Sequence, residues 1–306
     1  MSRHVFGPVP SRRLGRSLGV DLVPFKTCNY DCIYCQLGRT TCKTIQRKEW
    51  VPPDEVLRQL EERLATRPDY ITLAGSGEPT LHSALGYLID RIKAMTSVPV
   101  AVLTNGSLLW QREIRRELSN ADLVMPSLDA GDAATFQLVN RPHEAISFDH
   151  VLGGLVAFRR SFRGQLWLEI FLLAAHNAFD AELFRVRKWV DLIKPDRVQL
   201  NTATRPPAED YAIAVAPDRL RAIAQMFSPP AEVLSAFQAA ELSPGSPAEE
   251  EDILSLVERR PCGLEDIADA LALHASEVAK GLERLVAAGR IVQTIHGNQR
   301  YYRAIR

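Results

Sequence analysis

Three cysteines stand within eight residues of the run TCNYDCIYCQ: Cys28, Cys32 and Cys35, with the spacing C-x-x-x-C-x-x-C. Thiols this close along the chain do not make a disulfide framework, but a short loop can fold around one compact metal cluster, and iron–sulfur clusters are held by cysteine thiolates. Three ligands leave one iron of a four-iron cluster open. Because an open coordination position is typical of a reacting metal site, the spacing predicts a catalytic cluster.

Zinc is the alternative for this loop. A structural zinc site needs four protein ligands, and neither Cys42 nor His4 stands in a pairing that completes such a set. Cys42 lies close enough in sequence to touch the site, although a lone cysteine more often packs in the interior. Cys262 is expected to be an inert packing residue.

Composition limits the classes of protein that such a loop can serve. The 306 residues are 46% hydrophobic and 24% charged, as in a globular protein of one large or two unequal domains. The 37 basic and 37 acidic residues cancel, so no overall field attracts nucleic acid or a membrane. No signal peptide or membrane-spanning stretch is found, and the five cysteines fit a reducing compartment, so a cytoplasmic location is expected.

Charge is unevenly distributed along the chain. Residues 1–50 carry nine basic and three acidic side chains, a local balance of +6 around the cysteine loop. Such a face can attract an anionic substrate, a phosphate backbone or an acidic electron donor such as flavodoxin or ferredoxin. A merely solvated basic surface is the alternative.

Strand and helix patterns alternate over the first two thirds of the chain. Strands are predicted at Ser17–Leu22, Tyr70–Leu73, Val98–Leu103, Asp122–Ser127, Leu166–Leu173 and Arg197–Leu200. Helices are predicted at Pro53–Thr66, His82–Met95, Trp110–Leu118, Phe148–Phe162, Phe179–Ile193, Pro217–Phe227 and Ala231–Ala240. Strict alternation predicts an α/β fold with a parallel sheet, either doubly wound or closed toward a barrel, and six units are too few for a full eightfold barrel.

Polar motifs follow the ends of these predicted strands. They are the cysteine loop, GSGEPTLH at residues 75–82, TNGS at residues 104–107, SLDA at residues 127–130, Glu169 within the fifth strand, and QLNTATR ending at Arg205. In parallel βα folds, active sites are built from loops at the carboxyl ends of the strands. The motifs are therefore expected to meet at one mouth.

The cysteine spacing, with the aromatic Tyr34 directly before the last cysteine, resembles the signature of the radical SAM superfamily. The resemblance implies a partial six-stranded (β/α)6 TIM-like barrel and a [4Fe-4S] cluster whose open iron binds the amino and carboxylate groups of S-adenosylmethionine. One electron then cleaves the cofactor to a 5′-deoxyadenosyl radical that abstracts hydrogen from a substrate. Tyr34 is expected near the adenine, with ordinary loop packing as the alternative.

The resemblance also implies cofactor-binding roles for other motif residues. Gly77 and Glu78 match the glycine-glycine-glutamate-proline motif that holds the methionine amino group, with Ser76 in place of its first glycine. The further cofactor-binding candidates are Thr104, Asn105, Ser127, Asp129, Glu169 and Asn201. Turns and helix caps are the alternative roles for the glycine loop, the TNG run and Asp129, and Glu169 is expected to face the interior because an unpaired buried carboxylate is costly.

From Phe6 to Glu209 the chain is similar to the group of wybutosine-biosynthesis-type Fe–S oxidoreductases, in which the authentic wybutosine enzyme acts on a modified guanosine of tRNA. Candidate substrates are therefore a tRNA nucleoside or nucleobase derivative. Arg12, Arg13 and Arg205 are candidates to bind an anionic substrate group, because a guanidinium fork suits phosphate or carboxylate. Structural ion pairs are their alternative role.

The sequence predicts a radical SAM domain at residues 1–242, a linker at residues 243–248 and a separate domain at residues 249–306. Three amphipathic helices and a hairpin around Gly297 predict a winged helix-turn-helix for the last domain. It carries ten acidic and eight basic residues, a weak charge for binding DNA or RNA. Protein docking or substrate presentation are alternatives for it.

Two classes of function remain. The first is a radical SAM enzyme that modifies a nucleoside, a peptide or a small metabolite. The second is an Fe–S redox sensor that binds DNA through the winged helix. The ring of motifs favours the enzyme, because a sensor has no need for a cofactor pocket.

Overall fold

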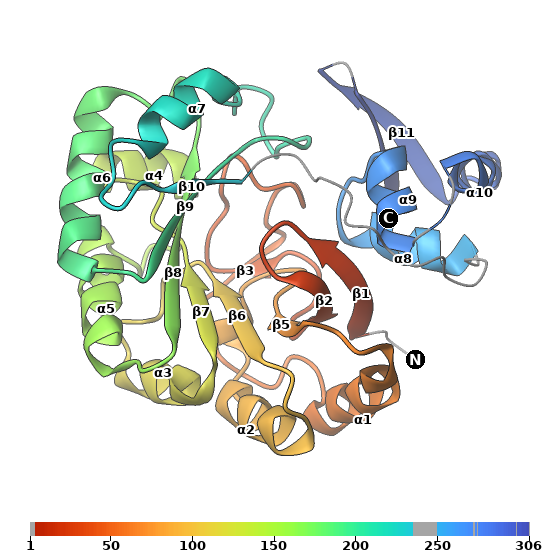
Figure 1. The fold of residues 1–306 in the computed structure, drawn as a ribbon, viewed down its shortest axis with the longest axis horizontal. Coiled ribbons are helices and arrows are strands. Elements are labelled where there is room, and N and C mark those ends of the chain that lie inside the picture. Colours follow the sequence, from red (N-terminus) through yellow and green to blue (C-terminus); the bar gives the residue numbers. More distant parts are fainter. Residues whose placement is uncertain (1–3, 235–249, 272, 274, 298, 306) are drawn as a thin grey trace.

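The protein is described from a computed structural model of residues 4–234, 250–271, 273, 275–297 and 299–305. A sheet of eight strands organises the first part of the chain, residues 4–234, called here the sheet region (Figure 1). In sheet order its strands are β1 (Val5–Ser11), β2 (Gly15–Val20), β5 (Tyr70–Leu73), β6 (Val100–Thr104), β7 (Leu123–Pro126), β8 (Gln165–Leu172), β9 (Arg197–Thr202) and β10 (Glu232–Val233).

The six predicted strands are confirmed as β2, β5, β6, β7, β8 and β9. Each pairs with the next in parallel, as the βα alternation predicts. β1 adds an antiparallel edge strand to β2, and β10 pairs in parallel with β9. An α/β fold with a parallel sheet is thus present.

The helix predicted at Ala231–Ala240 is wrong at its start. Glu232 and Val233 lie beside Gln199 and Leu200 of β9, so their backbone groups complete the sheet edge instead of a helix. From residue 235 onward the predicted helix lies outside the described residues, as does the predicted linker.

Helices cover the outer side of the curved sheet, where α1, α2, α3, α5 and α6 follow one another around its edge (Figure 1). The helices of this region are α1 (Pro53–Arg63), α2 (Leu85–Met95), α3 (Arg112–Glu117), α4 (Ala133–Asn140), α5 (Phe148–Ser161), α6 (Asp180–Ile193) and α7 (Pro217–Ala224), with 3-10 turns η1 (Leu64–Thr66), η2 (Pro79–Leu81) and η3 (Leu118–Asn120). Their apolar faces and the strands form the main core of this region, in which Leu18, Ile71 and Leu168 are completely buried.

Two differences from the predicted helices bear on the site. Helix α4 was not predicted from the sequence, although Asp132 caps it by accepting a hydrogen bond from the Thr135 N–H at 2.8 Å. α2 begins at Leu85 rather than His82, because η2 precedes it and the His82 ring bonds the Val51 carbonyl at 2.9 Å.

Residues 250–305, called here the C-terminal region, form a second core around Ile267, Val278 and Leu285. As predicted, they contain three helices and an antiparallel hairpin: α8 (Glu250–Arg259), α9 (Leu264–Leu271), α10 (Ala275–Ala287), β11 (Ile291–His296) and β12 (Gln299–Ala304). Figure 1 shows this region beside β1, and Val9 of β1 packs against its core. No described helix is long and apolar enough to cross a membrane.

Candidate functional site

One cavity of about 450 Å³ collects the predicted motifs. Of the fifteen candidate site residues, every one except Asp129 lines it. The lining members are Arg12, Arg13, Cys28, Cys32, Tyr34, Cys35, Gly77, Glu78, Thr104, Asn105, Ser127, Glu169, Asn201 and Arg205. Most of them follow or end different parallel strands, whereas Arg12 and Arg13 lie in the turn between β1 and β2 and Glu169 lies within β8. The sheet topology thus brings residues almost 200 positions apart to one cavity.

The cysteine loop begins at the short strand β3 (Thr27–Cys28), which pairs with β4 (Cys42–Lys43). The end of α4 holds its other side, because Ile33 N–H donates to the Val139 carbonyl at 3.0 Å. Cys42 is exposed and does not line the cavity, whereas Cys262 is buried in the C-terminal core.

Each candidate thiol accepts a hydrogen bond from a polar group around it. Cys28 Sγ accepts from the Tyr30 N–H at 3.4 Å, and Cys32 Sγ accepts from Asn140 Nδ2 at 3.5 Å. The Lys26 ammonium donates to Cys35 Sγ at 3.2 Å. Donors to sulfur stabilise thiolate ligands and tune a bound cluster.

These thiols fit an iron–sulfur cluster. Burial, and then the negative charge of Glu78, raise the pKa of Cys28 to about 12, and burial raises the pKa of Cys32 well above its usual range. Thiolates here therefore require a compensating cation, which iron supplies. Among the described residues no three His, Cys, Asp or Glu side chains converge on a single ion, and thiols bound to different irons of a cluster need not do so.

Tyr34 is held by a stack and a buried carboxylate. Its ring lies on Phe171 with centroids 3.9 Å apart, and its hydroxyl donates to Asp129 Oδ2. Asp129 also accepts from Asn140 Nδ2 at 2.7 Å and the Phe171 N–H at 2.9 Å. Asp129, predicted to bind the cofactor, thus lies outside the cavity lining and positions Tyr34. Burial raises its pKa to about 6.

The glycine loop lies directly against the cysteine loop. The Glu78 N–H donates to the Thr27 carbonyl at 3.1 Å, and a Cβ on Gly77 would meet that carbonyl oxygen at 1.8 Å. Only glycine therefore permits this approach. Ser76 replaces the first glycine of the family motif, and its backbone and hydroxyl both donate to Asp21.

Glu78 ties this loop to the TNG run. Its carboxylate accepts from the Thr104 hydroxyl at 2.6 Å and the Asn105 N–H at 2.7 Å. Asn105 Nδ2 also donates to Asn29 Oδ1 at 2.6 Å. Burial raises the pKa of Glu78, which these donors partly offset. Ser127, where β7 ends, completes this side of the cavity.

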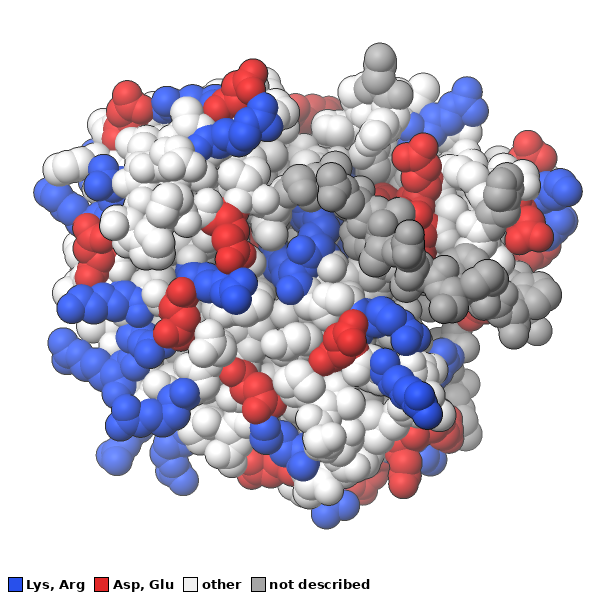
Figure 2. Space-filling model, in the orientation of Figure 1, with Lys and Arg blue, Asp and Glu red and all other residues white. Residues whose placement is uncertain are grey.

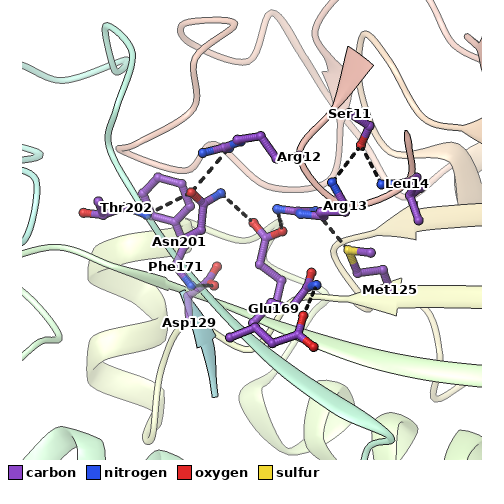
Figure 3. A network of polar contacts seen from close by, with 12 residues as sticks. Ser11, Arg12, Arg13, Leu14, Met125, Asp129, Glu169, Phe171, Asn201 and Thr202 are labelled. Atoms are coloured by element: carbon purple, nitrogen blue, oxygen red, sulfur yellow. Dashed lines mark hydrogen bonds and ion pairs between the residues drawn. The ribbon is translucent and has the colours of Figure 1, made fainter. Parts of the chain in front are cut away.

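Figure 3 shows a chain of polar contacts on the other side of the cavity. Glu169 of β8 forms an ion pair with Arg13 and accepts from Asn201 Nδ2 at 3.3 Å. Asn201 Oδ1 accepts from Arg12 Nη2 at 3.5 Å. Glu169 therefore faces the cavity and is paired.

Much of the basic excess of residues 1–50 is neutralised by carboxylates from later parts of the chain. Arg13 pairs with Glu169, Arg47 with Glu117 at 2.5 Å, and Arg39 with Glu209 at 2.5 Å. On the face shown in Figure 2, basic and acidic side chains are interspersed over most of the surface. This view therefore shows no uniformly basic face.

Sequence reasoning missed several residues of the site. Lys26 lies two residues before the first cysteine and belongs to none of the motifs found in the sequence. Asn140 comes from the unpredicted helix α4, and Arg260 reaches the cavity from the C-terminal region. The cap residue Asp132 was the available signal for α4; no local signal marks Arg260.

The fold and this site define the class of the protein. The model of the radical SAM superfamily matches residues 22–186, more than half of the chain. The chain belongs to the radical SAM superfamily, whose members typically bind a [4Fe-4S] cluster and S-adenosylmethionine.

Within that superfamily, the chain is a homologue of the UPF0026 proteins. A UPF0026 protein of Methanocaldococcus jannaschii is 32% identical over 97% of this chain and 94% of its own. A protein of Brachyspira hyodysenteriae named GTPase Obg is 42% identical over 96% of this chain, which spans only 44% of that protein. More distantly, a GTP 3′,8-cyclase of Mannheimia succiniciproducens is 24% identical over 53% of this chain and 47% of its own.

Solved structures show the same fold. A radical SAM methyltransferase from Sphaerobacter thermophilus superposes with a TM-score of 0.57 at 17% identity, covering 71% of this chain and 65% of the other. At this identity the similarity concerns the fold alone.

Proposed function

We propose that this protein is a radical SAM enzyme in which Cys28, Cys32 and Cys35 hold a [4Fe-4S] cluster. When bound, the cluster supplies the electron that cleaves S-adenosylmethionine to a 5′-deoxyadenosyl radical, which abstracts hydrogen from a substrate. The observation that carries the proposal is the cavity itself: the three thiols share it with the glycine loop, the TNG run and Asn201.

The surrounding residues have distinct parts in this function. The glycine loop, closed against Thr27 and held by Glu78, presents its backbone for the methionine amino group. The Tyr34 ring, held by its stack on Phe171, supports the adenine. Ser127 and Asn201 offer polar groups for the ribose and carboxylate, and the network around Glu169 keeps that side polar.

Release of 5′-deoxyadenosine tests the proposal. Protein reconstituted with iron and sulfide without oxygen, then given dithionite and S-adenosylmethionine, should release this nucleoside. Cys28→Ala, Cys32→Ala and Cys35→Ala should each abolish the release and lower the bound iron.

Cys42→Ala is the matched control, because Cys42 is exposed and lies outside the cavity lining. It should retain iron and nucleoside release. Wild-type protein that binds zinc, or a cluster with four protein ligands, and releases no nucleoside contradicts the proposal.

The proposed substrate is a nucleoside or nucleotide derivative. The similarity to a GTP 3′,8-cyclase and the wybutosine-type motifs both support this class. Deuterium transferred from a labelled nucleotide into 5′-deoxyadenosine supports it. Transfer from a peptide or another metabolite, with none from nucleotides, contradicts it.

We also propose the finer architecture. The six parallel strands form a partial (β/α)6 barrel within residues 1–242, and residues 249–306 form a winged helix-turn-helix domain joined through residues 243–248. The helices and hairpin of the C-terminal region support the second assignment. For nucleic acid the support is weak, since Arg284 of α10 pairs with Glu250.

The proposed electron donor is a flavodoxin or ferredoxin that docks beside the cysteine loop. The segment that follows this loop is at the surface, including the exposed Lys43 and Lys48. Acidic donors are attracted to such cations, and the attraction weakens with salt. Reduction by flavodoxin should therefore slow at high ionic strength, whereas a rate independent of salt contradicts this docking site.

A further inference from the structure

Four arginines line the cavity: Arg12, Arg13, Arg205 and Arg260. Two of them are paired with carboxylates. Arg13 pairs with Glu169, and Arg205 Nη2 lies 3.3 Å from Asp266 Oδ1 of α9. These pairs favour the structural role that was the alternative for both residues.

Arg12 and Arg260 have no carboxylate within 4 Å among the described residues. Among the described residues, the Arg12 guanidinium donates to the neutral Asn201 amide alone, at 3.5 Å (Figure 3). With Lys26 the cavity lining holds five cationic side chains, and its carboxylates are the four of Glu78, Glu169, Asp266 and Asp269. Five cations against four carboxylates leave a positive excess.

This arrangement is costly without an anion. Burial, and then the positive charges of Arg205 and Arg13, lower the pKa of Arg12 to about 10, and Arg260 acts in the same direction. Like charges held together away from water repel each other. A bound anion relieves this repulsion.

The C-terminal region brings Arg260 to the cavity, where Asp266, Asp269 and Ala270 also form part of the wall. Two further contacts join it to the sheet region, besides the ion pair of Arg205 with Asp266. Arg259 Nη1 lies 3.2 Å from Asp21 Oδ2, and the Tyr301 hydroxyl donates to the Thr204 carbonyl at 2.9 Å. Arg259, the neighbour of Arg260, thus forms an ion pair with Asp21, which accepts a hydrogen bond from Ser76 of the glycine loop.

We propose that Arg12 and Arg260 form a subsite for a phosphate group of the substrate, and that the C-terminal region is therefore a substrate-binding cap on the site. Two guanidinium groups from different parts of the chain suit a tetrahedral anion with several free oxygens, whereas one fork satisfies a planar carboxylate. The inference that this phosphate belongs to a substrate depends on the proposed function; the subsite itself does not.

The test uses the reconstituted full-length protein and inorganic pyrophosphate as the probe, measured by calorimetry. Pyrophosphate should bind saturably, and Arg12→Gln and Arg260→Gln should each weaken its binding at least tenfold. Arg260→Lys, which keeps the charge and loses the fork, should give an intermediate loss. Malonate should bind at least tenfold more weakly than pyrophosphate.

Arg290→Gln is the control, because Arg290 pairs with Glu251 at 2.8 Å and lies outside the cavity lining. It should bind pyrophosphate like the wild type. Binding that is indifferent to Arg12→Gln and Arg260→Gln in folded protein, the absence of binding, or equal binding of malonate each overturns the subsite.

The two proposals fail in different ways. Wild-type protein that binds pyrophosphate through these arginines and yet releases no 5′-deoxyadenosine overturns the proposed function and leaves the phosphate subsite standing. If the protein releases 5′-deoxyadenosine but binds pyrophosphate independently of Arg12 and Arg260, the phosphate subsite is overturned and the proposed function stands.

Discussion

Lys26 is a buried cation in direct contact with a candidate cluster ligand. Its ammonium lies 3.2 Å from Cys35 Sγ and is 3% exposed. A cluster becomes more negative when it is reduced, so a nearby positive charge favours the reduced form.

We expect Lys26→Met to lower the reduction potential of the bound cluster, because it removes both the charge and the donor. Lys26→Gln, which keeps a donor, should give a smaller decrease. Redox titration followed by electron paramagnetic resonance measures both. Unchanged potentials in variants with full iron content contradict the role of Lys26.

We expect Gly77→Ala to destabilise the protein by about 1–3 kcal/mol, as overpacking does. The added Cβ would stand 1.8 Å from the Thr27 carbonyl oxygen, next to the first cysteine. Urea unfolding measures the loss, and iron content should fall with it. A variant with wild-type stability and full iron would show that the loops can separate without cost.

At the scale of elements, adjacent glycines in α5 give a matched pair. A Cβ on Gly153 meets nothing within 4 Å, whereas a Cβ on Gly154 would stand 2.4 Å from the Trp110 nitrogen. Gly153→Ala should stabilise the protein by about 0.5–1 kcal/mol, and Gly154→Ala should destabilise it by about 1–3 kcal/mol. Equal effects in thermal unfolding would contradict the packing of α5.

His82, which lies between η2 and α2, should make the stability of the protein depend on pH. Burial lowers its pKa. The unfolded state, with a pKa of about 6.5, then binds the proton more readily. The contribution of neutral His82 to the free energy of unfolding should be fully present above pH 6.5. It should be lost as the pH falls from 6.5 toward the pKa of His82 in the folded protein.

His82→Gln should reduce this slope, as measured by urea unfolding between pH 5 and 8. The glutamine amide keeps a donor for the Val51 carbonyl. An identical slope in the wild type and the variant would assign the acid sensitivity to other groups.

The predictability of the elements depended on how each is stabilised. β8 has buried residues at most positions and was readable as an apolar run. The two-residue β10 has no such pattern, because its pairing with β9 stabilises it. α4 has a weakly amphipathic sequence, and only its cap residue Asp132 marks it.

Across the whole molecule, partly buried charges attach the C-terminal region to the sheet region. Arg259 and Asp21 have side chains 17% and 10% exposed, and the Arg259 guanidinium also lies 3.8 Å from the Phe6 ring centroid. Hydrogen bonds between such charged groups contribute about 1.5–3 kcal/mol.

We expect Arg259→Gln to loosen the C-terminal region from the sheet region. Amide hydrogen exchange should increase in α9 and in the glycine loop, because Asp21 holds both Arg259 and Ser76. Arg290→Gln, which breaks a pair within the C-terminal region, should leave the glycine loop unchanged. If the increase in exchange in Arg259→Gln is confined to α8, other contacts hold the C-terminal region against the sheet region.

The cysteine loop, the six strands of a parallel sheet and the motifs that follow them could be predicted from the sequence, because spacing and period are local properties of the chain. The folded structure was needed to show which arginines are paired, that Asp129 lies behind Tyr34, and that Arg260 enters the cavity. These depend on contacts between segments far apart in sequence. The sequence gives the charge of each side chain, but the packing of the folded chain determines which group it pairs with.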